Sequence, residues 1–118
     1  MTMRMLSPRK LAAVHASYYV VTGAWALVDR KSFERVTGPK RDYWLVRLVG
    51  ALAVAVGASL GSAVATGERR RDDTTLALAT SLAFVAADVH ASRSASPVYL
   101  GDVVVHAFFL PAWLRPWK

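Results

Sequence analysis

Residues 48–64 read LVGALAVAVGASLGSAV, a stretch with no charged side chain on any helical face and with serine as its only polar residue type. A helix of a soluble bundle needs a polar stripe toward water beside its apolar stripe toward the core. Because this stretch has no polar stripe, it predicts a helix whose whole circumference faces apolar surroundings.

The same pattern extends outward from this stretch over most of the chain. Short charged runs separate four apolar blocks, at residues 11–28, 43–66, 74–91 and 97–114. A helix of about 18 residues is about 27 Å long, close to the roughly 30 Å hydrocarbon core of a bilayer. We therefore predict an all-α fold: one integral membrane domain over residues 1–118, built as an up-down-up-down transmembrane four-helix bundle.

Two alternatives compete with this interpretation. The first block follows basic residues and resembles a signal peptide, but it is longer than a usual apolar signal core and carries His15, Tyr18 and Tyr19. A soluble four-helix bundle is the other alternative, and residues 48–64 argue against it. The membrane bundle remains the prediction.

Composition and charge exclude several classes of protein. The 118 residues are 54% hydrophobic and include no cysteine, which removes disulfides, iron–sulfur clusters and cysteine-ligated zinc. Fifteen basic residues against eight acidic ones give a net charge of +7. The basic residues lie between the apolar blocks, and Arg69–Arg71 are followed directly by Asp72 and Asp73, so we expect contacts with membrane lipids and not with nucleic acid.

The placement of basic residues also predicts location and topology. A multi-pass chain of this kind is expected in the cell membrane. Lysines and arginines are slightly more numerous on the side of the two termini, which favours cytoplasmic termini by the positive-inside rule.

Small residues recur every four positions along the second block, at Ala53, Gly57, Gly61 and Ala65. In lipid, such a stripe lets two helix backbones approach closely and gain dispersion contacts. We expect these residues to form a helix-packing face, either against the first or third helix of the same chain or against a second copy in a homodimer.

Charged residues inside the apolar blocks gather toward one side of the predicted bundle. In an up-and-down arrangement, Arg47, Asp88 and Asp102 all lie near the side where the first helix ends and the second begins. A charge in hydrocarbon is costly, so such residues normally face the bundle interior and pair. We expect Arg47 to pair with one aspartate and to leave the other partly uncompensated; a purely structural ion pair is the alternative.

Further polar residues extend this cluster on two helical faces. His106 follows Asp102 by one helical turn, and Tyr18 and Thr22 align in the same way on the first helix. Together they predict a narrow cavity open to one side of the membrane. The candidate ligand-binding residues are Tyr18, Thr22, Arg47, Asp88, Asp102 and His106.

No metal or cofactor is predicted. Asp102, His106 and His15 are acceptable ligand types, but they show no metal-site spacing. Each histidine also has a purely structural alternative to a role in the cavity. His15 is close to Lys10 and could lie at the membrane interface, and His106 could donate to a backbone carbonyl.

A dense signature spans the end of the first block, the first loop and the start of the second block. It comprises TGAW at residues 22–25, SF at 32–33, TGPK at 37–40, DYWLVR at 42–47 and Gly50. With this signature the chain resembles small four-span membrane proteins of bacteria or archaea, many of them uncharacterised. In architecture alone it is also similar to four-span EXPERA-type sterol isomerase and sigma-2-like proteins, in which acidic residues line an intramembrane ligand pocket. That similarity matches no motif, so it assigns no residue.

The leading functional hypothesis is that the polar cavity binds or passes a small or lipidic molecule. One alternative is a membrane enzyme that uses Asp102 and His106 as an acid–base pair. The other is a dimerising structural or accessory subunit that associates through the Gly57 and Gly61 face.

Overall fold

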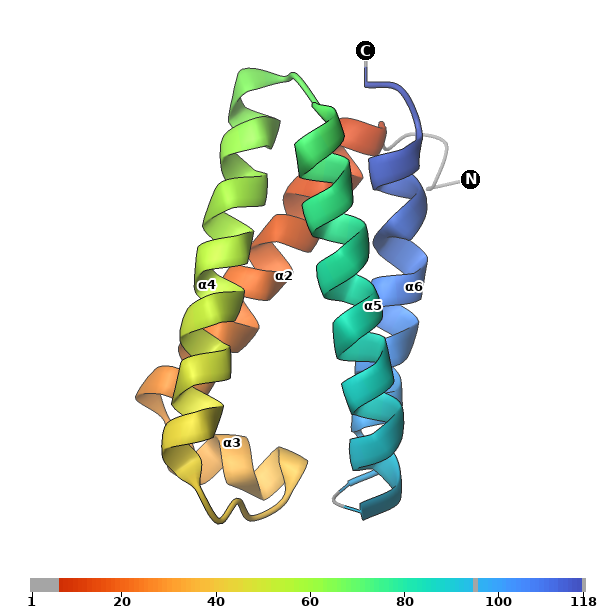
Figure 1. Cartoon of the computed structure of the whole chain (residues 1–118). Coiled ribbons are helices and arrows are strands. Elements are labelled where there is room, and N and C mark those ends of the chain that lie inside the picture. Colours follow the sequence, from red (N-terminus) through yellow and green to blue (C-terminus); the bar gives the residue numbers. More distant parts are fainter. Residues whose placement is uncertain (1–6, 95, 118) are drawn as a thin grey trace.

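The computed structural model describes residues 7–94 and 96–117, and this part of the chain is helical without strands (Figure 1). Its helices are α2 (Pro8–Val28), α3 (Arg30–Thr37), α4 (Tyr43–Thr66), α5 (Arg71–Ser94) and α6 (Tyr99–Leu114). The all-α prediction is confirmed.

Three helices, α2, α4 and α5, are long and apolar enough to cross a membrane, and α6 is a shorter apolar helix of 16 residues. Large apolar side chains cover the outside of the molecule; Leu52 is 56% exposed and Val104 is 66% exposed. Continuous apolar surface of this kind is rare on soluble monomers. These features indicate a membrane protein.

The long helices lie side by side and alternate in direction along the chain (Figure 1). They form two closely packed pairs, α2 with α4 and α5 with α6; α2 also packs against α6, whereas α4 and α5 contact each other much less. The beginning of α2 and the end of α6 lie at one end of the molecule, and α3 lies at the other (Figure 1). We call the latter the α3 end.

Local capping explains where two of the helices begin and end. Ser7 Oγ accepts a hydrogen bond from the Lys10 amide at 3.2 Å, so α2 begins at Pro8, before the expected residue 11. Gly67 ends α4 with a φ of 77°, a left-handed conformation that suits glycine. The Arg9 guanidinium donates to the carbonyls of Val64 at 2.8 Å and Ala65 at 3.3 Å, in the last turn of α4.

The boundaries of α5 and the start of α6 also differ from the predicted ones, whereas α4 covers the expected residues 43–66. Helix α5 covers Arg71–Ser94, longer than the expected 74–91, and α6 begins at Tyr99 instead of residue 97 because Pro97 and Val98 form a turn. Asp29 separates α2 from α3 by accepting from the Ser32 amide at 3.2 Å.

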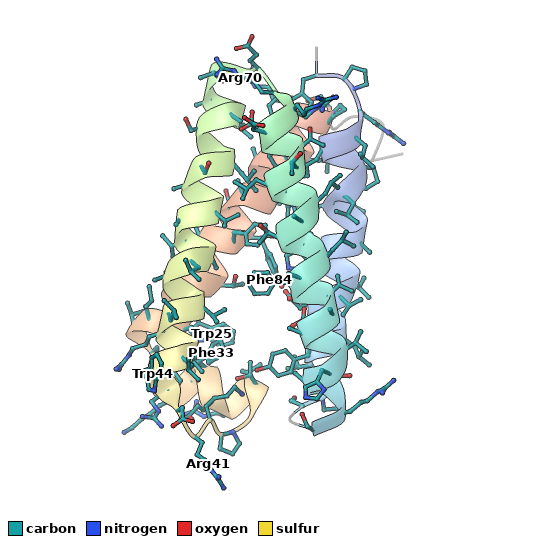
Figure 2. All side chains as sticks on the ribbon, in the orientation of Figure 1. Trp25, Phe33, Arg41, Trp44, Arg70 and Phe84 are labelled. Carbon is teal, nitrogen blue, oxygen red and sulfur yellow. The ribbon has the colours of Figure 1, made fainter. Side chains whose placement is uncertain are left out.

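Helix α3 packs across the α3 end of the molecule. Trp25 donates from Nε1 to Ser32 Oγ at 2.7 Å, and its ring packs edge-on against Phe33 at 5.1 Å (Figure 2). Ser96, in the connection between α5 and α6, donates to the Val36 carbonyl at 3.4 Å. Helix α3 therefore links the first helix pair to the second.

Close packing of α2 on α4 depends on glycine. A Cβ atom added to Gly57 would lie 2.6 Å from Val20 Cγ2 and 2.8 Å from the Ala16 carbonyl oxygen. Ala53, one turn earlier on α4, is also buried. One turn later the helices have separated, because a Cβ on Gly61 would meet nothing within 4 Å, and Ala65 is exposed. The small-residue stripe thus packs on α2 over its first half only.

Candidate functional site

A chain of hydrogen-bonded side chains crosses the interior between α2 and α6. Trp113 Nε1 donates to His15 Nδ1 at 2.9 Å, and His15 Nε2 lies 3.1 Å from His106 Nδ1. His106 Nε2 lies 3.4 Å from Asp102 Oδ2, and the Tyr18 hydroxyl donates to Asp102 Oδ1. We call these five residues the polar chain.

Helical spacing explains why these side chains meet. Asp102 and His106 are one turn apart on α6 and share a face with Trp113 two turns further on. His15 and Tyr18 share a face of α2, which packs on α6. His15, His106 and Trp113 are almost completely inaccessible. A polar connection through the apolar interior results.

Asp88 joins this arrangement from α5. Its side chain is 5% exposed, and its Oδ2 has no hydrogen-bond partner among the described residues. One carboxylate oxygen of Asp88 lies within 4.8 Å of ligand-type atoms of Asp102 and His106. We call Asp88 and Asp102 the acidic pair.

Aromatic rings pack around His106, the histidine that contacts the acidic pair. Phe84 projects from α5 into the interior, where its ring stacks on His106 at 5.6 Å (Figure 2). Tyr19 packs against Phe84 at 5.8 Å and shares a 3.0 Å hydrogen bond with Ser81. The acidic pair is thus flanked by apolar and aromatic surfaces.

Arg47 is not part of this cluster. Its side chain is exposed, and its guanidinium lies 5.4 Å from the centre of the Tyr43 ring. In the described part of the chain, neither aspartate forms an ion pair with lysine or arginine, so the expected pairing of Arg47 with Asp88 or Asp102 is absent. The reason is that Tyr43 offers an aromatic face near the start of α4, where a long cationic side chain also reaches the membrane surface.

Thr22 lies near the cluster without forming a hydrogen bond to any of its side chains. Its hydroxyl donates to the Tyr18 carbonyl of the same helix at 2.7 Å. Tyr18, Asp88, Asp102 and His106 are therefore the predicted site residues that the structure brings together, whereas Arg47 lies apart from them and the Thr22 hydroxyl binds only backbone carbonyls of its own helix.

Sequence reasoning missed the roles of Trp113 and His15. Tryptophans near the end of an apolar span usually lie at the membrane surface, but Trp113 is completely buried and binds His15. His15 is buried too, not interfacial. One signal in the sequence is the position of each histidine along its helix. His15 lies about as far from the start of α2 as His106 lies from the end of α6, and these two helix ends lie at the same end of the molecule, so the two histidines are at the same level.

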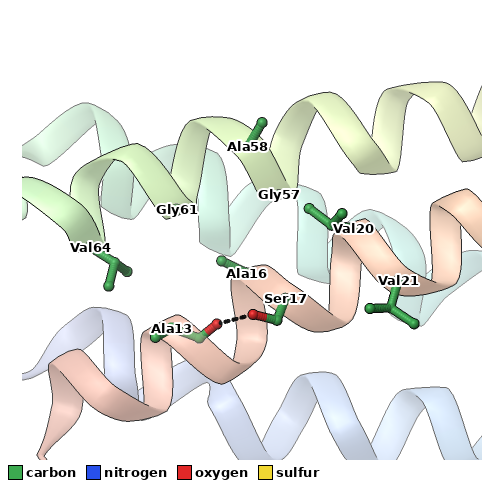
Figure 3. A pocket seen from close by; sticks show the side chains of 9 residues that line it. All are labelled: Ala13, Ala16, Ser17, Val20, Val21, Gly57, Ala58, Gly61 and Val64. Atoms are coloured by element: carbon green, nitrogen blue, oxygen red, sulfur yellow. Dashed lines mark hydrogen bonds between the residues drawn. The ribbon is translucent and has the colours of Figure 1, made fainter.

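A second feature is an apolar groove of about 470 Å³ on the other side of α2, between α2 and α4 (Figure 3). It lies where the two helices separate beyond Gly57. Its lining comprises Ala13, Ala16, Ser17, Val20, Val21, Gly57, Ala58, Gly61 and Val64. The Ser17 hydroxyl is satisfied by the Ala13 carbonyl at 2.9 Å, so the groove offers a ligand mostly methyl groups.

When both imidazole rings are neutral, the hydrogen bonds of the polar chain can run in only one donor-to-acceptor direction, from Trp113 toward Asp102. An indole N–H can only donate, so His15 Nδ1 must accept and His15 Nε2 carries the proton. His15 therefore donates to His106 Nδ1, and His106 Nε2–H donates to Asp102. Both oxygens of Asp102 then accept hydrogen bonds, one from His106 and one from Tyr18, which stabilises its carboxylate form.

No protein-family model matches the chain, and no curated protein or solved structure is significantly similar to it. The functional interpretation therefore depends on the geometry of the polar chain and the acidic pair.

Proposed function

We propose that the protein is a multi-pass protein of the cell membrane whose acidic pair binds or passes a small or lipidic molecule. In this proposal α6 is a fourth span beside α2, α4 and α5, and both termini are cytoplasmic. Tyr18 and His106 orient the Asp102 carboxylate toward the bound molecule.

The observation that carries the proposal is the unpartnered Oδ2 of Asp88. A buried polar atom without a hydrogen bond is expensive, and a carboxyl group in a membrane span is more so. Such residues usually mark a substrate or ion path. A molecule that donates a hydrogen bond to Asp88 removes this cost, so the site favours occupancy.

Partial access to the cluster supports binding over a purely structural role. The Asp102 side chain is 23% exposed and Tyr18 is half-buried, whereas His106 is 2% exposed. A molecule that reaches Asp102 thus contacts a carboxylate held by two donors. The deeper histidines support this carboxylate without being exposed themselves.

Cysteine labelling in membranes tests whether the cluster is accessible. The chain has no native cysteine, so Asp102→Cys introduces a single reactive site. We expect it to react with a charged methanethiosulfonate reagent, because the thiolate forms only where water enters. Val104→Cys is the matched control; it lies on the same helix and is 66% exposed on the apolar outer surface, so it should stay unreactive.

The outcome that would contradict the proposal is equal inertness of Asp102→Cys and Val104→Cys in folded protein. The cluster would then be dry and structural. Circular dichroism of both variants confirms that the helices are retained.

A membrane enzyme is a second candidate, and one observation favours it. His106 Nε2 lies 3.4 Å from Asp102 Oδ2, a distance that suits an acid–base pair once substrate tightens the site.

The accessory-subunit alternative depends on Gly61 and Ala65, which α2 leaves uncovered. A second copy that packs there would need to fill the groove between α2 and α4.

A further inference from the structure

The acidic pair presents hydrogen-bond acceptors and negative charge without a matching cation. Asp102 is the anionic member, because Tyr18 and His106 each donate to one of its oxygens. Asp88 approaches it within 4.8 Å and has a buried, unpartnered Oδ2. No lysine or arginine of the described residues forms an ion pair with either aspartate. A partner that matches this pair supplies positive charge and hydrogen-bond donors.

The surroundings of the pair restrict the rest of the partner. Rings of Phe84, Tyr19 and His106 pack together on the inner side, and the outer helix surfaces are apolar. A strongly hydrated ion gains little from such walls. An organic cation with an apolar body gains both hydrophobic contact and attraction to the ring faces.

The direction of the polar chain argues against a divalent metal ion. A metal bound by Asp88, Asp102 and His106 needs the lone pair of His106 Nε2, which moves the ring proton to Nδ1. His106 would then donate to His15 Nε2, and a neutral His15 would carry its proton on Nδ1, against the Trp113 N–H at 2.9 Å. Metal binding thus breaks a buried hydrogen bond that the unliganded chain makes.

We infer that the acidic pair is a binding site for a protonated amine with an apolar body. The ammonium group donates hydrogen bonds to Asp88 and Asp102 and neutralises their shared charge, while its hydrocarbon part lies along the aromatic and apolar side chains. This assignment depends on the proposed function, because it names the class of molecule that the same site takes.

The test uses the full chain in nanodiscs of zwitterionic phosphatidylcholine with hexylamine as the probe. Binding is measured by equilibrium dialysis, with protein-free nanodiscs subtracted for partitioning. We expect saturable binding that weakens about tenfold or more in Asp102→Asn, which removes the negative charge, and in Asp88→Asn, which replaces a carboxyl oxygen acceptor with an amide donor. Asp72→Asn is the matched control; it is an exposed acid on the same helix as Asp88, and we expect its binding to be unchanged.

Two probes of similar length separate charge from hydrogen bonding. Hexanol keeps a donor without charge, and hexyltrimethylammonium keeps the charge without an N–H donor. Both are expected to bind at least about tenfold more weakly than hexylamine, because each lacks one of the two features that the acidic pair requires. Equal binding of the quaternary ammonium would overturn the role assigned to the N–H donors.

Other results contradict the inference in different ways. If Zn²⁺ binds and displaces hexylamine, the site is a metal site. If Asp72→Asn weakens hexylamine binding as much as Asp88→Asn does, the amine is held by surface charge alone. If hexylamine does not bind while Asp102→Cys is accessible to water, the amine assignment is wrong and the broader binding proposal stands.

Discussion

Replacing Gly57 by alanine should destabilise the protein, whereas the same change one turn later, at Gly61, should not. Both glycines lie on α4, and both changes add one methyl group to a helix. At Gly57 that methyl group meets Val20 Cγ2 at 2.6 Å and the Ala16 carbonyl oxygen at 2.8 Å. At Gly61 it meets no atom within 4 Å.

The size of the effect follows from two contributions. Alanine is favoured over glycine in a helix by about 1 kcal/mol, and this gain is common to both variants. Overpacking a close contact costs about 1–3 kcal/mol, and it applies to Gly57→Ala alone because the Ala16 oxygen belongs to a rigid helix backbone. Gly57→Ala should therefore be less stable than Gly61→Ala by about 1–3 kcal/mol, with Gly61→Ala neutral or stabilised by up to about 1 kcal/mol.

The assay is reversible unfolding of the purified protein in mixed micelles, followed by tryptophan fluorescence as the fraction of denaturing detergent increases. Cross-linking of the same samples reports the oligomeric state. Gly61→Leu extends the series, because a larger side chain there blocks a second copy while leaving the α2 contact intact.

Equal stabilities of Gly57→Ala and Gly61→Ala would refute the close approach of α2 and α4. Loss of a cross-linked dimer in Gly61→Leu, with unchanged monomer stability, would show that the uncovered half of the stripe binds another copy.

Three further predictions concern other parts of the molecule. Trp113→Phe leaves His15 Nδ1 buried without its donor, which should cost about 1–3 kcal/mol in unfolding free energy and move the His15 ring ¹⁵N resonances; unchanged resonances would refute the direction of the polar chain. Arg47→Gln should change stability by less than about 0.5 kcal/mol, because the side chain is exposed; a large loss in the same unfolding assay would restore the ion-pair hypothesis. The Lys40 amide donates to Glu34 and lowers the pKa of its carboxyl, so this loop contact contributes stability above the ordinary pKa of glutamate and loses it as the pH falls through the lowered value; protection of the Lys40 amide, measured as its hydrogen-exchange rate relative to the intrinsic rate at each pH, should fall there, and pH-independent protection would contradict it.

Much of the architecture could be predicted because it depends on the length and polarity of segments. Residues 48–64 exclude a polar stripe, and Gly67 marks the end of its helix. The convergence of Asp88 and Asp102 follows from counting residues along helices of alternating direction. The i, i+4 spacing likewise placed His106 beside Asp102.

The sequence could not predict which face of each helix points into the molecule, because that depends on the rotation of the helix about its own axis. Arg47 lies at the expected end of the molecule, but an apolar helix gives no periodic signal to show which face is inside. Its long side chain also has a competing partner in Tyr43. The role of Trp113 is hard to predict for a related reason, because tryptophans near the end of a span usually lie at the membrane surface and only a facing histidine reveals the exception.

The contacts within each helix pair differ from the contacts between the two pairs, and this difference sets an order of folding. Within the first pair, α2 and α4 meet through small apolar residues, and only α3 separates the two helices in the chain; α5 and α6 are consecutive helices that form a second hairpin. The contacts between His15 and His106, Tyr18 and Asp102, and Tyr19 and Ser81 all join one hairpin to the other. Each hairpin is therefore expected to insert into the bilayer during synthesis as its own unit, and the polar groups find their partners only when the second hairpin docks. Two separately expressed halves, cut within the loop that follows Gly67, should for the same reason assemble in the membrane into one molecule.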